Sequence, residues 1–470
     1  MEKLIGRNAE TELLSKFMES GRSEFIALYG RRRVGKTFLI RSFFKDNFDF
    51  YVTGMLEGKK DDEMEIFIEA LRKYGYNGPK PETWMKVFAC LGDFLETKKR
   101  KKRCVVFIDE LPCFDTQHSG FVNAFGHFWN SRASWMDNIF LIVCGSATSW
   151  MIRNIINNHG GLHNRITHSI HLKPFNLAQT ESYLKSKKSK WTRLSILQAY
   201  MSLGGIPYYL SLLDCNLSIA ENIDNLFFKE NAELSDEYKR LYQSLYRNPG
   251  RYMDIIELLS EQKHGLTRTE ISNKLKISSG SHLSDMLDDL VYCDFVRKYK
   301  DGTKLNSVIY QLVDFFTLFY LKFCNKGIVD QRFWCHSINT PTQNNWYGLA
   351  YERVCLFHIQ EIIKSLHLDT MHTDYYSWRS KNKTDGAQID IVIDRADNII
   401  NICEVKYSKS DYLLTKNEYG KIQRRISSFE EEMKESKGLQ TVLITTFNAK
   451  RNNYLEIFQH TVLLNNLYDN

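Results

Sequence analysis

Short apolar runs separated by helical patterns mark the first third of the chain. Residues 25–29, 104–108 and 139–144 are apolar runs of strand length. After the first run, residues 38–44 show the spacing of a helix with an apolar face. Strands that are apolar throughout are typical of parallel sheets covered on both faces. The pattern predicts an α/β domain.

The junction between the first strand and its helix matches the P-loop, or Walker A, pattern G-x-x-x-x-G-K-[ST]. Two glycines let backbone N–H groups surround a phosphate at the start of a helix. The lysine would reach the β- and γ-phosphates, and the threonine hydroxyl would bind Mg²⁺. We therefore expect ATP and Mg²⁺ as cofactors, bound at Gly30, Arg31, Arg32, Arg33, Val34, Gly35, Lys36 and Thr37.

Two carboxylates end the second apolar run, at Asp109 and Glu110. A parallel strand would carry them to its carboxyl edge, where ligands bind in open α/β sheets. Asp109 would hold Mg²⁺ through water, and Glu110 would polarise the attacking water. A strand that merely ends in acids is the alternative, which the preceding P-loop makes less attractive. Gly145 and Ser146 directly follow the third apolar run.

The middle of the chain does not repeat the strand–helix order of the first third. Residues 251–312 predict two helices, a turn and two strands, at 291–299 and 308–312, around a hairpin at 300–304. This is the order of a winged helix. The candidate recognition helix, 282–290, contains three aspartates and no arginine. We favour a packing or weak backbone-binding role over major-groove reading.

Charged residues interrupt two apolar strands near the C-terminus, predicted at 388–393 and 399–406. Asp390 lies inside the first, and Glu404 and Lys406 share one face of the second. Burial of such groups is costly unless they pair or bind a metal. Two carboxylates on adjacent strands predict a Mg²⁺ site, and the lysine could orient or deprotonate a water. A surface hairpin with ordinary salt bridges is the alternative.

Composition limits the class of protein. A chain of 470 residues suggests roughly three domains. Net charge is +7, which is compatible with nucleic acid but does not establish it. The ten cysteines include no C-x-x-C pair, and no apolar stretch is long enough to span a bilayer. We expect a cytoplasmic protein without a membrane partner, and interpret the basic run 98–103 as a solvated loop.

The order of motifs in the first half resembles a predominantly archaeal and bacterial family of ATPases within the AAA+/STAND group. The motifs are GRNAE, GRRRVGKT, VVFIDE, GSA, NRIT with KPF, and GGIPYYL. The resemblance implies a P-loop NTPase core with a helical lid, and that the GRNAE segment packs against the adenine. It also implies sensor or finger roles at the γ-phosphate for Ser146 and Arg165, with a surface salt bridge as the alternative for Arg165.

The C-terminal pattern resembles the PD-(D/E)xK nuclease superfamily, with Glu352 as the carboxylate of a helix expected to begin at Trp346, after a polar linker at 339–345. The resemblance implies that Glu352, Asp390 and Glu404 bind the metal and that Lys406 is catalytic. Lys421 and Gln423 are weaker supporting positions. No Pro-Asp dipeptide precedes Asp390, which puts activity in doubt.

These observations predict four domains: a P-loop core (1–175), a helical lid (176–245), a winged helix (246–315) and a restriction-endonuclease-like α/β domain (316–470). The leading hypothesis is an ATPase that controls a Mg²⁺-dependent, DNA-processing nuclease. The alternative is an ATPase switch whose inactive nuclease-like domain binds DNA or protein. A third hypothesis is nucleotide-controlled self-association into a homo-oligomer.

Overall fold

A computed structural model describes residues 4–98, 102–246, 248–300, 308–380, 386–433 and 437–469. The chain divides into two compact units. The first comprises Met1–Pro174 with Gln243–Arg247, and the second comprises Phe175–Tyr242 with Asn248–Asn470. Within the described residues, no helix has both the length and the apolar character that crossing a bilayer requires. Part of the basic run 98–103 and most of the hairpin 300–304 lie outside the described residues.

A five-stranded parallel sheet forms the centre of the first unit, in the order β2-β3-β4-β1-β5. The three predicted strands are confirmed and occupy its middle. The edge strands β2 and β5 are short and were not predicted, since they lack a long apolar run. The bounds are β1 Glu24–Tyr29, β2 Phe50–Thr53, β3 Cys104–Asp109, β4 Ile139–Gly145 and β5 His168–His171.

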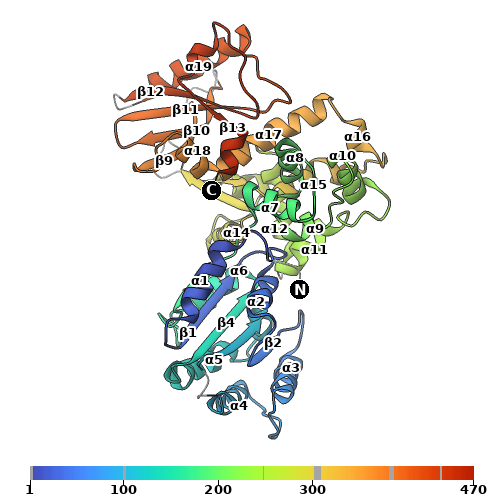
Figure 1. Ribbon diagram of the computed structural model, residues 1–470, viewed down its shortest axis with the longest axis vertical. Helices are drawn as coiled ribbons and strands as arrows, with labels where there is room; N and C mark the ends of the chain where they lie inside the picture. Colours follow the sequence, from blue (N-terminus) through green and yellow to red (C-terminus); the bar gives the residue numbers. More distant parts are fainter. Residues whose placement is uncertain are drawn as a thin grey trace. The chain divides into compact units, whose positions relative to one another are not determined.

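Helices cover both faces of this sheet (Figure 1). One face carries an aromatic core in which Phe25 packs against Phe125, with ring centroids 5.5 Å apart. On the other face Phe44 packs against Phe140, at 5.8 Å. The first face is covered by α3 Lys60–Lys73, α4 Trp84–Glu96 and α5 Phe121–Ser131, and the second by α1 Asn8–Met18 and α2 Lys36–Phe44. Shorter helical turns follow the strands, at η1 Leu111–Phe114, η2 Ala133–Trp135, α6 Thr148–Trp150 and η3 Met151–Ile156.

The carboxylate of Glu63 on α3 is fully buried in the first unit. Its two oxygens accept from the backbone N–H of Met55, at 3.1 and 3.4 Å. Burial raises the pKa of Glu63 to about 7, although the Met55 N–H opposes the shift. A Cβ at Gly58 would lie 2.2 Å from a Glu63 oxygen, so a larger residue there would displace the carboxylate.

Replacing Glu63 by glutamine should remove part of the pH dependence of stability. Because the folded-state pKa lies above the unfolded value, protonation stabilises the fold at low pH, and this contribution is lost as pH rises towards 7. The free energy of unfolding lost in this way is at most about 3 kcal/mol. Chemical denaturation should show wild type losing stability relative to Glu63→Gln between about pH 5 and about pH 8. Glu69→Gln, an exposed position on the same helix, is the control. A constant difference between wild type and Glu63→Gln would contradict the assignment.

The second unit begins with helices. They are α7 Leu177–Ser186, α8 Arg193–Leu203, α9 Pro207–Ser211, α10 Ile219–Ile223, η4 Asp224–Phe228 and α11 Glu237–Leu245, the last of which crosses into the first unit. The chain bends between α8 and α9, at the GGIPYYL motif. Gly204 has φ +67°, and a Cβ on Gly205 would lie 1.8 Å from the carbonyl oxygen of Phe175. The bend therefore requires glycine.

Three helices and a small antiparallel sheet follow, with strand order β6-β8-β7. The bounds are α12 Pro249–Ser260, β6 Leu266–Thr267, α13 Arg268–Leu275, α14 Ser281–Tyr292, β7 Val296–Lys300 and β8 Val308–Leu312. A capping box begins α13, since Thr267 and Glu270 exchange hydrogen bonds. The predicted strand 291–299 begins too early, because α14 runs to Tyr292 and the chain turns at Asp294, with φ +58°.

A mixed five-stranded sheet completes the second unit, in the order β13-β12-β11-β10-β9. Strands β9, β10 and β11 are antiparallel, whereas β11, β12 and β13 are parallel. The bounds are β9 Thr373–Arg379, β10 Gln388–Arg395, β11 Ile399–Lys406, β12 Gly438–Thr445 and β13 His460–Leu463. The two predicted strands and their turn are confirmed.

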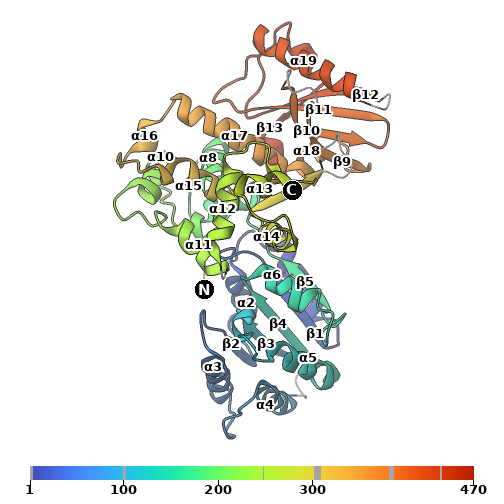
Figure 2. The same cartoon turned by 180° about the vertical axis from the view of Figure 1, so that it is seen from behind.

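Helices pack around this sheet (Figures 1 and 2). From α19, Phe429 packs edge-on against Trp378, at 5.2 Å. The helix that carries Glu352 contacts β11 and begins at Pro341, inside the predicted linker, because Pro341 occupies its first turn. The helical bounds are α15 Phe315–Phe323, η5 Cys324–Lys326, α16 Phe333–His336, α17 Pro341–Phe357, α18 Ile359–Ser365, α19 Lys416–Glu432, η6 Leu455–Ile457 and η7 Leu464–Tyr468.

Candidate nucleotide site and nuclease-like carboxylate site

The P-loop connects β1 to the N-terminus of α2, as predicted. Its two glycines are needed for different reasons. Gly35 has φ +90° and open space around the position of a Cβ, so it gives the loop its left-handed turn. Gly30 has φ +146°, and a Cβ there would lie 2.3 Å from the carbonyl oxygen of Leu172. One glycine shapes the loop and the other lets it pack against the segment after β5.

Lys36 is buried within this loop, with 6% of its surface exposed. Its ammonium group donates to the carbonyl oxygens of Gly30 and Arg31, at 2.8 and 3.0 Å. The positive charge is therefore fixed inside the ring of backbone that the motif predicts for phosphates. In the rest of the loop, Arg31 and Val34 are buried, and Arg32 and Arg33 are half-buried.

Thr37 and Asp109 meet at the carboxyl edge of the sheet, where the Thr37 hydroxyl donates to Asp109 Oδ2 at 2.7 Å. The other oxygen, Oδ1, accepts from the backbone N–H of Glu110 at 2.9 Å and from the thiol of Cys144 at 2.6 Å. Burial raises the pKa of Asp109, and the bonds from Cys144 and Thr37 oppose it. A hydroxyl and a carboxylate oxygen side by side suit Mg²⁺, which prefers oxygen ligands.

Glu110 and Ser146 are also brought together. Glu110 has φ +47°, and its Oε2 accepts from the Ser146 hydroxyl at 2.8 Å and from the Ser146 N–H at 3.0 Å. The serine therefore fixes the direction of the carboxylate beside the P-loop. Arg165, in contrast, is exposed, and within the described residues its side chain has no ion pair. Its finger role stays a prediction.

Arg7, from the GRNAE segment, braces the P-loop. Its side chain is buried and donates to the carbonyl oxygens of Val34 and Lys173, at 3.0 and 2.9 Å. The segment thus connects the P-loop with the chain after β5. The family resemblance implies that this segment packs against the adenine, and the spacing of its residues gives no signal for the contacts of Arg7.

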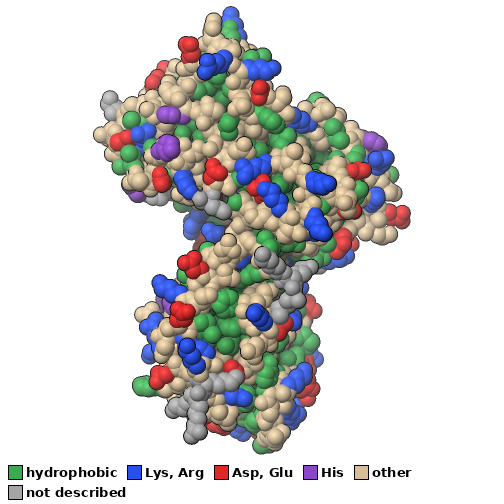
Figure 3. Space-filling model, in the orientation of Figure 1, with side chains coloured by type: hydrophobic (Ala, Val, Ile, Leu, Met, Phe, Trp, Pro, Cys, Tyr) green, Lys and Arg blue, Asp and Glu red, His purple; other side chains and the backbone are tan. Residues whose placement is uncertain are grey.

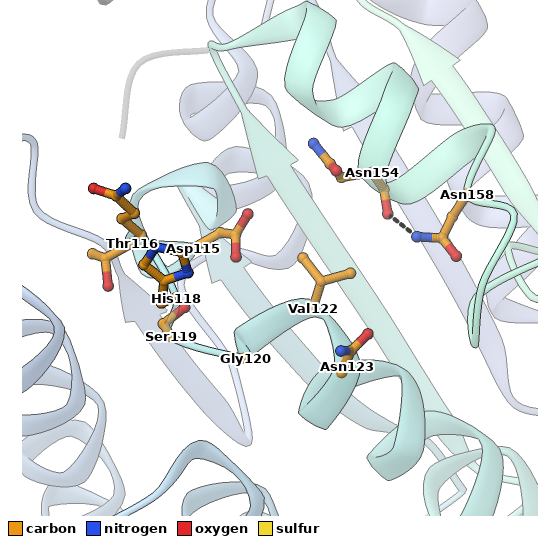
Figure 4. A pocket seen from close by; sticks show the side chains of 10 residues that line it. Asp115, Thr116, His118, Ser119, Gly120, Val122, Asn123, Asn154 and Asn158 are labelled. Carbon is orange, nitrogen blue, oxygen red and sulfur yellow. Dashed lines mark hydrogen bonds between the residues drawn. The ribbon is translucent and has the colours of Figure 1, made fainter.

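A polar pocket of about 480 Å³ lies beyond the carboxyl ends of β3 and β4 (Figure 4). The loop after η1 supplies Asp115, and Asn154 and Asn158 come from the segment after β4. Trp150 donates to Asp115 at 2.9 Å. No P-loop residue lines this pocket, so it is separate from the predicted phosphate site.

In the second unit, Glu352 of α17 and Asp390 of β10 face a lysine that the sequence interpretation did not include. The ammonium group of Lys263 lies 2.8 Å from Glu352 Oε2 and 3.8 Å from Asp390 Oδ2. Burial and the neighbouring Asp390 raise the pKa of Glu352, and Lys263 opposes them. His264 Nδ1 lies 3.8 Å from Asp390 Oδ1. Burial, followed by the charge of Lys263, lowers the pKa of His264 to about 3.

The predicted pair on β11 has partners of its own. Lys406 contacts Glu404 at 2.9 Å, as the shared face predicts, and Glu418 at 3.6 Å. Arg425 of α19 holds Glu404 with two bonds, at 2.8 and 3.1 Å. Arg425 is thus the residue of this helix that contacts the pair, whereas Lys421 and Gln423 are exposed and Gln423 contacts Tyr419, so their supporting role stays a prediction.

The structure does not bring Glu352, Asp390 and Glu404 into one metal site. The register of β10 shifts between Ile389 and Val392, and such a bulge redirects the side chains within it. Asp390 accordingly contacts Lys263 and His264, whereas Glu404 contacts Arg425. Across the described ranges, no group of three His, Cys, Asp or Glu side chains is arranged to hold a metal ion. With the charges of Lys263 and Arg425 already against them, the carboxylates as placed here do not hold a divalent ion.

Comparison with known proteins gives a family match that covers most of the first unit and the first helices of the second. Residues 4–213 match a family model described as an ATPase domain predominantly from Archaea. An uncharacterised protein of Methanocaldococcus jannaschii, MJECL04, is 23% identical over 401 residues, which cover 83% of each chain.

Two solved structures are similar at low identity. A Walker-type ATPase of Pyrococcus abyssi has 18% identity and a TM-score of 0.45, over 68% of this chain and 96% of its own. The ORC2 protein of Aeropyrum pernix has 13% identity and a TM-score of 0.41, over 68% and 93%. Together with the P-loop and the carboxylates at the sheet edge, the family match shows that the chain contains a P-loop ATPase domain within residues 4–213.

Proposed function

We propose that this protein is an ATP-hydrolysing switch whose nucleotide state controls a nuclease-like, DNA-processing domain. The observation that carries the first part is the convergence of Lys36, Thr37, Asp109 and Glu110 at one edge of the parallel sheet. Lys36 would neutralise the phosphate charge, and Thr37 and Asp109 would hold Mg²⁺. A bound Mg²⁺ stabilises negative charge on the phosphates. Glu110, oriented by Ser146, would polarise the attacking water.

The intermediate segments would transmit the nucleotide state. We assign residues 176–245 as the helical lid and 246–315 as the winged helix, for which the order α12, α13, α14 and the sheet β6-β8-β7 are the support. Asp289 of the candidate recognition helix is buried and accepts from Tyr252 at 2.6 Å. A packing role for this helix therefore remains preferred to base reading.

The C-terminal part, 316–470, would be the PD-(D/E)xK-like domain. Glu352, Asp390 and the Glu404–Lys406 pair lie on a helix and two adjacent strands, in the order that the resemblance implies. Exposed basic residues of α19 add positive charge at the end of this domain that Figure 3 shows uppermost, and such charge suits contacts to a phosphate backbone. These are Lys416, Lys421 and Arg424.

Cleavage and binding without cleavage are both candidate activities of this domain. The E-x-K arrangement supports cleavage. The contacts of Lys263 with Glu352 and of Arg425 with Glu404 favour the alternative, an inactive domain that binds DNA or protein.

A cleavage assay separates these possibilities. Linear, branched and single-stranded DNA would be incubated with Mg²⁺ or Mn²⁺, with and without ATP, using wild type and Lys406→Ala. Cleavage that depends on ATP and is lost in Lys406→Ala supports the nuclease. Binding without cleavage supports the alternative. If no condition gives cleavage or binding, the DNA-processing proposal fails. Light scattering with and without ATP would test nucleotide-controlled self-association.

A further inference from the structure

We propose that the ammonium group of Lys263 takes the place of a metal ion at the carboxylates of Glu352 and Asp390 and so closes this site. Displacement of the Lys263 side chain would open the site to a divalent metal ion. This inference rests on the proposed nuclease-like domain and concerns its regulation. Lys263 belongs to the loop between α12 and β6, whereas the carboxylates belong to α17 and β10. The closing charge thus comes from a different part of the second unit.

The position of the ammonium group is the first support. It lies between two carboxylates, 2.8 Å from Glu352 and 3.8 Å from Asp390. Two nearby carboxylates repel each other, and a positive charge between them relieves that repulsion. A divalent cation would relieve it in the same way, so Lys263 and a metal ion compete for the same oxygens.

The backbone of Lys263 is held by buried donors. Its carbonyl oxygen accepts from Arg353 at 3.2 Å and from Gln311 at 2.5 Å. Both side chains are nearly inaccessible, with 3% and 5% of their surface exposed. Arg353 directly follows Glu352 on α17, so the same helical turn supplies a carboxylate for the ammonium group and a donor for the carbonyl.

The neighbouring residues fix the loop in the same position. The carbonyl oxygen of His264 accepts from Tyr299 at 2.6 Å. Gly265 has φ +75°, and a Cβ there would lie 2.2 Å from the carbonyl oxygen of Tyr310. Tyr299 and Tyr310 belong to β7 and β8. The loop is therefore fixed to the small sheet as well as to α17, so withdrawal of Lys263 from the carboxylates is a movement of its side chain.

The Lys263 side chain is partly exposed to solvent, so it can move away from the two carboxylates. Its exposed fraction is 38%, against 19% for Glu352 and 24% for Asp390. An ion pair with one partly exposed member can exchange with solvent more easily than one that is fully buried. The anchoring resides in the backbone and the blocking charge in the side chain, so a substitution can remove the charge and leave the loop in place.

Metal binding by Lys263→Ala tests the proposal. Binding of Mn²⁺ would be followed by electron paramagnetic resonance in nucleotide-free protein, in a Lys36→Ala background that prevents nucleotide carry-over. Lys263→Ala should bind one further Mn²⁺ per chain, with affinity raised by at least about tenfold over the parent. Lys274→Ala, an exposed lysine of α13, should behave as the parent. Adding Asp390→Asn to Lys263→Ala should remove the gain.

Thermal unfolding gives a second readout. Without metal, Lys263→Ala should unfold at a lower temperature than the parent, because the carboxylates lose their counter-charge, and Mn²⁺ should restore the difference. Lys263→Met keeps more of the side-chain packing and should give the same metal response. If neither variant gains Mn²⁺ binding or Mn²⁺-dependent stabilisation over the parent, the proposal is overturned.

The outcomes separate this proposal from the nuclease itself. The Lys263→Ala variant would also be made with Lys36 restored. If this variant gains a bound Mn²⁺ but cleaves no DNA, the result supports the closing role of Lys263 and rejects the nuclease. Cleavage by wild type that is lost in Lys406→Ala, with no gain of metal in Lys263→Ala, would support the nuclease and reject the closing role.

Discussion

Replacing Lys36 by alanine should abolish ATP binding. The side chain is buried, and its ammonium group sits inside the P-loop, bound to the carbonyl oxygens of Gly30 and Arg31. Charge-assisted contacts from a fixed ammonium to phosphate oxygens are among the strong polar interactions. We expect ATP affinity to fall by at least about a hundredfold, measured by titration calorimetry.

The control for this change is Lys16→Ala, an exposed lysine of α1. It should bind ATP as wild type does. Thermal unfolding would check that Lys36→Ala remains folded, since the lysine also bonds the loop. ATP affinity unchanged in a folded Lys36→Ala protein would refute the P-loop assignment.

Glu110→Gln should keep ATP binding and nearly stop hydrolysis. A glutamine oxygen can still accept from Ser146, so the local geometry should survive, but an amide cannot serve as a base. A positioned general base contributes about a hundredfold to ten-thousandfold in rate. We expect phosphate release to fall by at least about a hundredfold, with ATP affinity within about threefold of wild type.

Glu12→Gln, an exposed carboxylate of α1, is the matched control and should hydrolyse ATP normally. Turnover by Glu110→Gln equal to that of wild type would remove Glu110 as the catalytic carboxylate. Asp109 would then be examined in its place, since its oxygens already contact Thr37 and Cys144.

The nucleotide site could be predicted because each of its motifs is a short continuous stretch of sequence. The P-loop is contiguous, and the strand before Asp109 and Glu110 is apolar throughout, so both strand and acids are visible in the sequence. The contacts that complete the site join distant residues. Arg7 reaches Lys173, and Cys144 reaches Asp109. No spacing rule connects these pairs, although the GRNAE segment drew attention to Arg7.

The C-terminal site could be predicted only in part, for the same reason. The strands, the turn and the Glu404–Lys406 contact follow from the alternation of residues. The shift in register inside β10 has no signal in the alternation of its residues, so the separation of Asp390 from Glu404 does not follow from the sequence. Lys263 lies 89 residues from Glu352, and only the fold brings them together. The start of β7 was misplaced because the apolar pattern at 291–299 continues from the end of α14.

Binding of DNA by Glu110→Gln in different nucleotide states tests most directly whether the ATPase controls the C-terminal domain. Fluorescence anisotropy would give the DNA affinity of this variant with ATP and Mg²⁺, with ADP and without nucleotide, and of Lys36→Ala under the same conditions. We predict a change of at least about tenfold between the ATP-bound and nucleotide-free states of Glu110→Gln, and none in Lys36→Ala. Equal DNA affinity in every nucleotide state would contradict the control of the C-terminal domain by ATP.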